Sequence, residues 1–103
     1  MITRIVKLSI KAENKQEFIA LFLNYKNKII LSEGCLSVEL LQDKQDENTF
    51  FTYSKWENNE ALENYRSSEL FAIIWPKVKL LFNLKAQAWT VSKLESAKNI
   101  QSP

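Results

Sequence analysis

The strongest constraint on the fold is a run of aromatic and β-branched residues that no glycine or proline interrupts. Residues 49–56 read Thr-Phe-Phe-Thr-Tyr-Ser-Lys-Trp, a composition that favours a β-strand. Successive side chains of a strand point to opposite faces, so Phe50 and Trp56 share one face while Phe51 and Tyr53 share the other. Large aromatic side chains on both faces predict that both faces of this strand are covered.

The residues after Trp56 have the features of a helix start. Asn58 or Asn59 can cap the helix, and Glu60 and Glu63 place negative charge near its positive end. Small folds form pockets where the end of a strand leads directly into a helix. Trp56, which lies at this junction, is therefore expected to line a pocket.

Three further segments alternate between apolar and polar residues and predict strands at 2–10, 36–41 and 85–94. A polar stretch, 42–48, predicts a hairpin loop between the second strand and the strand at 49–56. Residues 14–32 carry apolar side chains at helical spacing, with Asn14 and Glu17 resembling a capping box and Gly34 acting as the stop signal. The second helix, from about residue 58, is expected to weaken at Ser67 and Ser68.

Pro76 predicts a break in the second helical region. A proline disfavours helical backbone at the residue before it, here Trp75, and removes one hydrogen-bond donor. Proline is also tolerated in the first turn of a helix, so Pro76 can open a last short helix that ends at Phe82.

The resulting order is strand, helix, strand, strand, helix, strand. This order predicts an α+β, ferredoxin-like βαββαβ fold in which helices cover one face of a four-stranded antiparallel sheet. We expect one domain at residues 1–95 and a flexible tail at 96–103. The sheet face away from the helices carries an apolar set: Ile5, Leu41, Phe51, Tyr53, Trp89 and Val91. An apolar face of this size predicts a homodimer packed sheet to sheet.

Composition limits the possible partners of the protein and its expected cellular location. The net charge is +2 with the basic residues spread along the chain, so we expect no nucleic-acid partner. We expect no membrane association, because no apolar run approaches the roughly 18 residues of a membrane helix. Met1 leads directly into an alternating segment without the pattern of a signal peptide. Together with a single cysteine, Cys35, this predicts a cytoplasmic protein.

Histidine is absent from the chain. Its absence removes the commonest general base, the usual haem and zinc ligand, and every nucleophile that histidine activates. Asp43, Asp46 and Glu47 lack the spacing and the glycine of a calcium loop. Cys35 is expected to be a small buried side chain, because a nucleophile would need a nearby base. We therefore expect no metal and no cofactor.

Several motifs together resemble the antibiotic biosynthesis monooxygenase (ABM) domain family. These motifs are Gly-Cys-Leu-Ser-Val-Glu-Leu at 34–40, Thr-Phe-Phe-Thr-Tyr-Ser-Lys-Trp-Glu-Asn at 49–58, Glu-Ala-Leu at 60–62 and Ser-Ser-Glu-Leu-Phe at 67–71. The resemblance covers roughly residues 1–94. It implies a dimeric α+β barrel and a cofactor-independent monooxygenase acting on a small aromatic, quinol-like or anthrone-like substrate with O₂.

The chain departs from the family pattern in two places. Many members have a histidine in the second helix where this chain has Tyr65, and haem-degrading members have a ligand histidine where it has Trp75. These departures imply that neither haem binding nor a histidine-dependent mechanism applies here. The competing hypothesis is a non-catalytic, ligand-binding or stress-related dimeric module of the same fold.

Five residues are the candidates for the site, each with a structural alternative. Trp56 either stacks on a flat substrate or fills the core. Tyr65 donates a hydrogen bond to the substrate, or accepts a proton if its pKa is lowered, or packs on the sheet. Arg66 and Arg4, the only arginines, either stabilise a phenolate or reach solvent. Asn58 either polarises a carbonyl group or caps the helix. The functional hypothesis makes Tyr65 and Arg66 catalytic and Trp56, Asn58 and Arg4 substrate-binding.

Overall fold

The computed structural model describes residues 1–99 and contains four strands, three α-helices and one turn of 3₁₀-helix. In chain order these elements are β1 (Ile2–Ser9), η1 (Ala12–Asn14), α1 (Lys15–Ile30), β2 (Cys35–Gln42), β3 (Thr49–Trp56), α2 (Asn59–Arg66), α3 (Glu69–Lys79) and β4 (Gln87–Val91).

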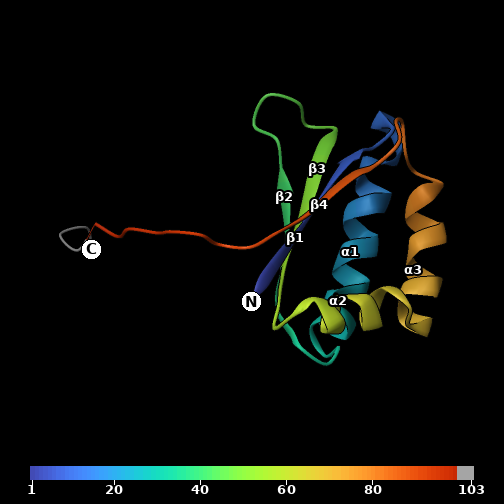
Figure 1. Ribbon diagram of the computed structural model, residues 1–103. Coiled ribbons are helices and arrows are strands. Elements are labelled where there is room, and N and C mark those ends of the chain that lie inside the picture. Colours follow the sequence, from blue (N-terminus) through green and yellow to red (C-terminus); the bar gives the residue numbers. More distant parts are fainter. Residues whose placement is uncertain (100–103) are drawn as a thin grey trace.

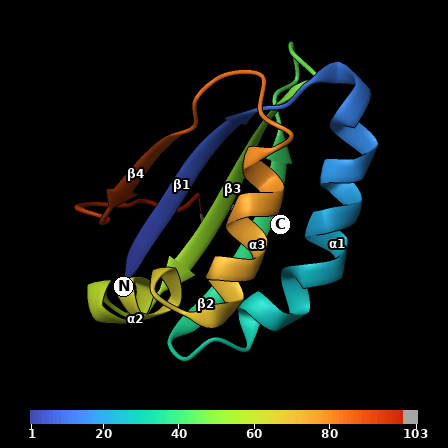
Figure 2. The same ribbon diagram turned by 90° about the vertical axis from the view of Figure 1, so that its right-hand side faces the viewer.

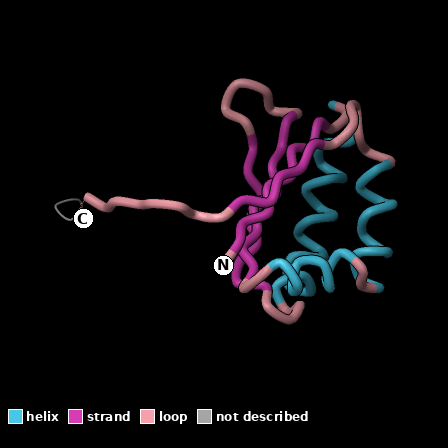
Figure 3. The backbone as a smooth tube through the Cα atoms, viewed as in Figure 1, coloured by secondary structure: helices cyan, strands magenta, loops and turns pink. Residues whose placement is uncertain are grey.

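The strands form one antiparallel sheet in the order β2-β3-β1-β4. The three α-helices lie on one side of the sheet, and the opposite side is open in this single chain (Figures 1 and 2). Figure 3 shows the two layers, with the helices on one side and the strands on the other. The predicted α+β ferredoxin-like fold is confirmed.

The core lies between the sheet and the helices. Leu8 and Phe50 of the sheet are almost fully buried, and Phe18 of α1 packs on Phe50 with 5.0 Å between ring centroids. Ile74 and Val78 of α3 complete this cluster. Each buried apolar side chain contributes about 1.5–3 kcal/mol, so this cluster is the main force that holds the helices on the sheet.

The register of the strands sets which side chains point away from the helices. Ile5 pairs with Tyr53 on one neighbouring strand and with Trp89 on the other, and Phe51 pairs with Leu41. Neighbours across the strands share a face, so the six apolar residues predicted for the open face lie there together. Trp89 is 45% exposed in the single chain, which leaves a large apolar surface in contact with water.

The ends of α1 differ from the prediction. The Asn14 side chain makes no capping hydrogen bond, and the Asn14 amide donates to the Lys11 carbonyl within the turn of 3₁₀-helix before α1. The predicted capping box is therefore wrong. Helix α1 ends at Ile30, and Gly34 follows in the left-handed region with φ of +80°, where it turns the chain into β2.

The second helical region is divided at the serines rather than at the proline. Ser68 begins α3 by accepting a hydrogen bond from the Phe71 amide on its side-chain oxygen. Pro76 lies inside α3, so the predicted break at Trp75 and the last short helix are wrong. Both Pro76 and Ala72 are exposed. Water can therefore bond the Ala72 carbonyl that Pro76 leaves unpaired.

The last strand is shorter than the predicted strand at 85–94. β4 ends at Val91, and residues 92–99 extend away from the sheet on the side opposite the helices (Figure 1). The rest of the predicted tail, residues 100–103, lies outside the described residues. Over residues 1–99, no helix is both long and apolar enough to cross a membrane.

Candidate active site

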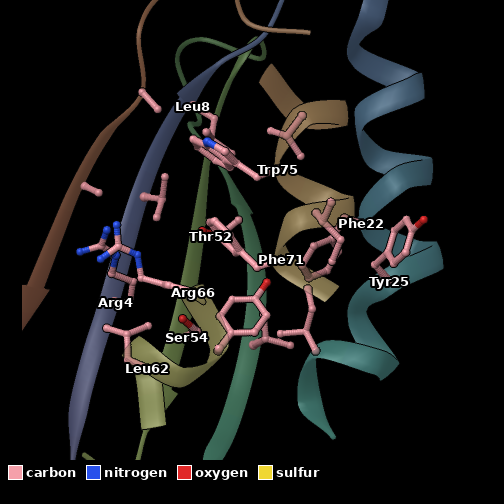
Figure 4. A pocket seen from close by; sticks show the side chains of 18 of the residues that line it. Arg4, Leu8, Phe22, Tyr25, Thr52, Ser54, Leu62, Arg66, Phe71 and Trp75 are labelled. Carbon is pink, nitrogen blue, oxygen red and sulfur yellow. The ribbon is translucent and has the colours of Figure 1, made fainter. Parts of the chain in front are cut away.

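A pocket of about 350 Å³ lies between the sheet and the helices (Figure 4). Most of its lining is apolar and comes from β1, β3, α1, α2 and α3. Its polar side chains are few: Arg4, Thr52, Ser54, Tyr25, Tyr65 and Arg66. An apolar cavity with a few convergent polar groups is the usual form of a small-molecule site.

Trp56 lies against this pocket at the end of β3. Its indole is fully buried, and its Nε1–H donates a hydrogen bond to the Ser54 hydroxyl at 2.9 Å. The ring of Tyr65 stacks on it, with 5.1 Å between centroids and 28° between planes. Trp56 therefore lines the pocket with one face covered by Tyr65, and the stacking of a substrate on the indole stays a prediction. Trp56 supports Tyr65 from behind.

Tyr65 is held in this position by α2. Burial, with the neighbouring Cys35 thiolate as a smaller cause, raises the pKa of Tyr65 to about 12. The condition for Tyr65 to act as a base, a lowered pKa, is therefore not met. Among the described residues its hydroxyl has no hydrogen-bond partner, so it can donate to a molecule in the pocket. Cys35 is half-buried, and this burial raises the pKa of its thiol, which favours the protonated form.

The aromatic wall continues along α3. Phe71 meets Tyr65 edge to face at 5.3 Å between centroids, and Trp75 stacks on Phe71 at 5.7 Å and 13°. Neither Phe71 nor Trp75 was among the residues that the sequence predicted for the site. The signal of a pocket was that both are aromatic and four residues apart, so that one stacks above the other on the same helix face.

Arg4 and Arg66 reach the same end of the pocket from different elements. The Arg4 Nη1 donates to the Thr90 hydroxyl at 2.8 Å, and the Arg66 Nη1 lies 3.2 Å from the Glu63 carboxylate. Figure 4 shows both arginines at the end near Leu62. Burial lowers the pKa of Arg4, and the positive charge of Arg66 lowers it further, against the smaller effect of Glu63.

Asn58 is the one candidate that the structure leaves outside the pocket. Its Oδ1 accepts a hydrogen bond from the Ala61 amide at 2.8 Å, so Asn58 caps α2. The acidic loop also has a local role, because Asp46 accepts bonds from the Asn48 amide and the Thr49 hydroxyl. Across residues 1–99, no group of three or more His, Cys, Asp or Glu side chains is placed to hold a metal ion.

The pocket can bind and orient a planar molecule, but its lining supplies no proton acceptor. Arg4 and Arg66 are its only charged residues, and none of its lining residues is Asp, Glu, Lys or His. The Tyr65 hydroxyl and the two guanidinium groups are all hydrogen-bond donors. The arrangement therefore favours a ligand that carries negative charge on oxygen.

Comparison with known proteins identifies the family. The sequence profile described as antibiotic biosynthesis monooxygenase matches residues 1–73. A curated relative, an uncharacterized protein of Synechocystis, is 28% identical over 64 residues, which cover 62% of this chain. The match spans 44% of that protein, so the chain covers less than half of the relative's length.

Solved structures with the same fold have low sequence identity. An antibiotic biosynthesis monooxygenase superposes with a TM-score of 0.85 at 20% identity, covering 92% of this chain and 100% of the other. Rv0793 from Mycobacterium tuberculosis superposes with a TM-score of 0.84 at 15% identity, covering 94% of this chain and 98% of the other. SnoaB is a cofactor-independent oxygenase from Streptomyces nogalater. A mutant of it superposes with a TM-score of 0.84 at 12% identity, covering 95% of this chain and 97% of the other.

These structures are similar in fold alone, whereas the profile match extends over more than half of the sequence. It includes β1, α1, the β2–β3 hairpin and α2, the elements that carry Arg4, Trp56, Tyr65 and Arg66. The chain belongs to the antibiotic biosynthesis monooxygenase family.

Proposed function

We propose that the protein is a monooxygenase that oxidises a planar phenolic or anthrone-like substrate with O₂ and without a cofactor. One observation carries the proposal: an apolar pocket whose lining contains strong hydrogen-bond donors and no Asp, Glu or His side chain. Tyr65, Arg4 and Arg66 supply these donors. Such a pocket holds an oxyanion more tightly than a neutral molecule, which is the requirement for chemistry on the substrate anion.

The reaction would use the electrons of the substrate itself. An anthrone that loses a proton becomes an anion with its charge on oxygen, and this anion reacts directly with O₂. One oxygen atom replaces two hydrogens at the substrate carbon, and the other oxygen atom leaves as water. The arginines stabilise the anion, Tyr65 donates to its oxygen, and the apolar walls exclude water.

The lining lacks a base, so the proton would pass to water at the mouth of the pocket. The donors make this loss easier because they lower the pKa of a bound phenol or anthrone. In this mechanism Tyr65 and Arg66 act on the reacting oxygen, and Arg4 and the Trp56–Tyr65 stack position the rings. Asn58 takes no part beyond capping α2.

We propose that the working form is a homodimer in which the open sheet faces of two copies pack together. The support is the apolar set that includes Ile5, Phe51, Tyr53 and Trp89, which the single chain leaves uncovered. A second copy brings an identical apolar face about a two-fold axis, so both surfaces are removed from water at once. The cytoplasmic location stays a prediction from the sequence.

Oxygen uptake with a panel of quinols and anthrones tests the proposal. Wild-type protein is expected to consume O₂ faster than buffer with at least one planar substrate, with and without a metal chelator. Tyr65→Phe is the matched variant, because it removes only the pocket hydroxyl. Uptake that remains at the buffer rate for the whole panel would contradict the proposal.

The second candidate function is a binding module without catalysis. The observation that favours it is the lack of a proton acceptor in the pocket. A binding module would take up planar phenols, with heat released in calorimetry, yet leave the rate of oxygen uptake unchanged. Binding and oxygen uptake measured on the same ligand therefore separate the two functions.

A further inference from the structure

We propose that Arg4 and Arg66 form a carboxylate-binding subsite, so that the ligand of this pocket is a planar aromatic carboxylate. The inference deepens the proposed function and rests on it for the use of this pocket by the substrate. It specifies the polar group of the ligand, a carboxylate.

The distribution of basic residues is the first observation. The chain has two arginines and twelve lysines. Both arginines line the pocket, and none of the lysines does. Arginine differs from lysine in presenting a planar fork of donors that matches the two oxygens of a carboxylate. A pocket that needed only positive charge could use either residue type.

The charge balance is the second observation. Arg66 is paired with Glu63, whose side chain does not line the pocket, whereas Arg4 has no carboxylate within ion-pair distance among residues 1–99. Two guanidinium groups therefore share one carboxylate at the end of an apolar cavity. Arg66 is exposed, but Arg4 is partly removed from water, and a bound anion would offset the cost of that desolvation.

The geometry leaves donors free for such an anion. Thr90 engages one nitrogen of Arg4 and thereby fixes the direction of its side chain. A guanidinium group has five N–H donors, so Arg4 retains donors that can reach a ligand. Arg4 lies between Ser54 and Thr90 of the neighbouring strands, on the helix-facing side of the sheet. A flexible surface arginine would not be held in this way.

A carboxylate fits this end better than the phenolic oxygen does. A carboxylate is ionised throughout the neutral range, and its two oxygens can engage both guanidinium groups. The phenolic oxygen beside the carboxylate can accept from Arg66 and from the Tyr65 hydroxyl, which has no partner among the described residues. The aromatic rings of such a ligand would lie against Phe71 and Trp75, which form the apolar wall (Figure 4).

Calorimetry with a matched pair of ligands tests the subsite. The probes are 1-hydroxy-2-naphthoate and 1-hydroxy-2-naphthamide, which share rings and hydroxyl and differ in charge. Titrations are made without oxygen, so turnover does not enter the result. We expect the acid to bind about 10- to 100-fold more tightly than the amide, because two charge-assisted contacts are added. Added salt should reduce this ratio.

Two variants test whether the preference for the acid depends on Arg4 and Arg66. In the double variant Arg4→Gln with Arg66→Gln, the ratio should fall to about one, because the charge-assisted contacts that only the acid can make are lost. Lys79→Gln removes a positive charge from the exposed C-terminal end of α3, far from the proposed contacts. This variant should leave the ratio of the two affinities unchanged. Circular dichroism checks that each variant is folded.

Three results would overturn the inference: equal affinity of the wild type for acid and amide, a ratio insensitive to salt, or a ratio that survives in the double variant. The first two need no variant, so they decide the question even if the double variant does not fold. Preference for the acid without oxygen uptake would contradict the proposed function but support the subsite. Oxygen uptake with neutral quinols and no preference for the acid would do the reverse.

Discussion

Tyr65 is the residue on which the candidate site depends. Its ring packs between Trp56 and Phe71, and its hydroxyl is free among the described residues. We predict that Tyr65→Phe changes the free energy of unfolding by less than about 1 kcal/mol, because no protein hydrogen bond is lost. Turnover of a phenolic substrate should fall by about 10²-fold, because an oxyanion donor is removed. Urea unfolding and oxygen uptake measure the two effects.

Trp56→Ala provides the contrast in the same experiment. The indole is fully buried, so its removal should lower the free energy of unfolding by about 3–5 kcal/mol. A loss of activity in Tyr65→Phe accompanied by an equally large loss of stability would contradict the separate roles of the two rings. In that case the hydroxyl would be structural.

The raised pKa of Tyr65 predicts how stability changes at high pH. The pKa is 10.0 for an ordinary tyrosine and about 12 in the folded chain, so the unfolded state loses the proton first. The contribution of Tyr65 to stability is therefore full below pH 10 and is lost as pH rises through about 12. Thermal unfolding across this range should show a smaller decrease in Tyr65→Phe than in the wild type. An identical decrease would contradict the assignment.

At the scale of elements, Gly34 lies directly before β2 and packs closely against Ala61 of α2. Its φ of +80° is unfavourable for other residues, and a Cβ at this position would lie 2.4 Å from the Ala61 Cβ. We predict that Gly34→Ala lowers the free energy of unfolding by about 2–4 kcal/mol through backbone strain and overlap together. Urea unfolding measures the loss.

The double variant Gly34→Ala with Ala61→Gly separates the two causes. It removes the overlap with the Ala61 Cβ and retains the backbone strain at residue 34. The effect of Gly34→Ala should therefore be smaller when it is measured against Ala61→Gly alone. Equal effects in the two backgrounds would mean that the close approach of α2 to this turn contributes nothing.

The elements themselves were largely predictable, because alternation of apolar residues fixes which face of a strand is buried. The open-face set with Ile5, Tyr53 and Trp89 followed from that alternation. The helix boundaries were not predictable from the sequence, because they depend on competing local hydrogen bonds. The Asn14 amide donates within the 3₁₀ turn, and Ser68 rather than Pro76 divides the second helical region.

The pocket was predictable in position but not in construction. The junction after Trp56 indicated where a cavity would lie, and Tyr65 was a candidate for the same site. The direct stack of the two rings depends on how closely α2 approaches the sheet, which sequence spacing does not give. The convergence of Arg4 and Arg66 likewise depends on the tertiary fold, since the two residues are far apart in the chain.

At the scale of the whole molecule, the open sheet face predicts a homodimer. Trp89→Lys places a charge in this face and should convert the dimer to monomers in sedimentation-velocity runs at micromolar concentration. Leu80→Lys is the control, because Leu80 is 76% exposed on the helical side. The Leu80→Lys protein should remain dimeric. A wild-type protein that sediments as a monomer would contradict the proposed assembly.

The most direct test of the proposed function follows the oxygen atoms. Anthrone is incubated with the protein under isotopically labelled O₂ in unlabelled water, and the anthraquinone formed is analysed by mass spectrometry. The account predicts product formation faster than in buffer, with one labelled oxygen atom per product molecule, and a slower rate in Tyr65→Phe. Product that forms no faster than in buffer, or that takes its new oxygen from water, would contradict it.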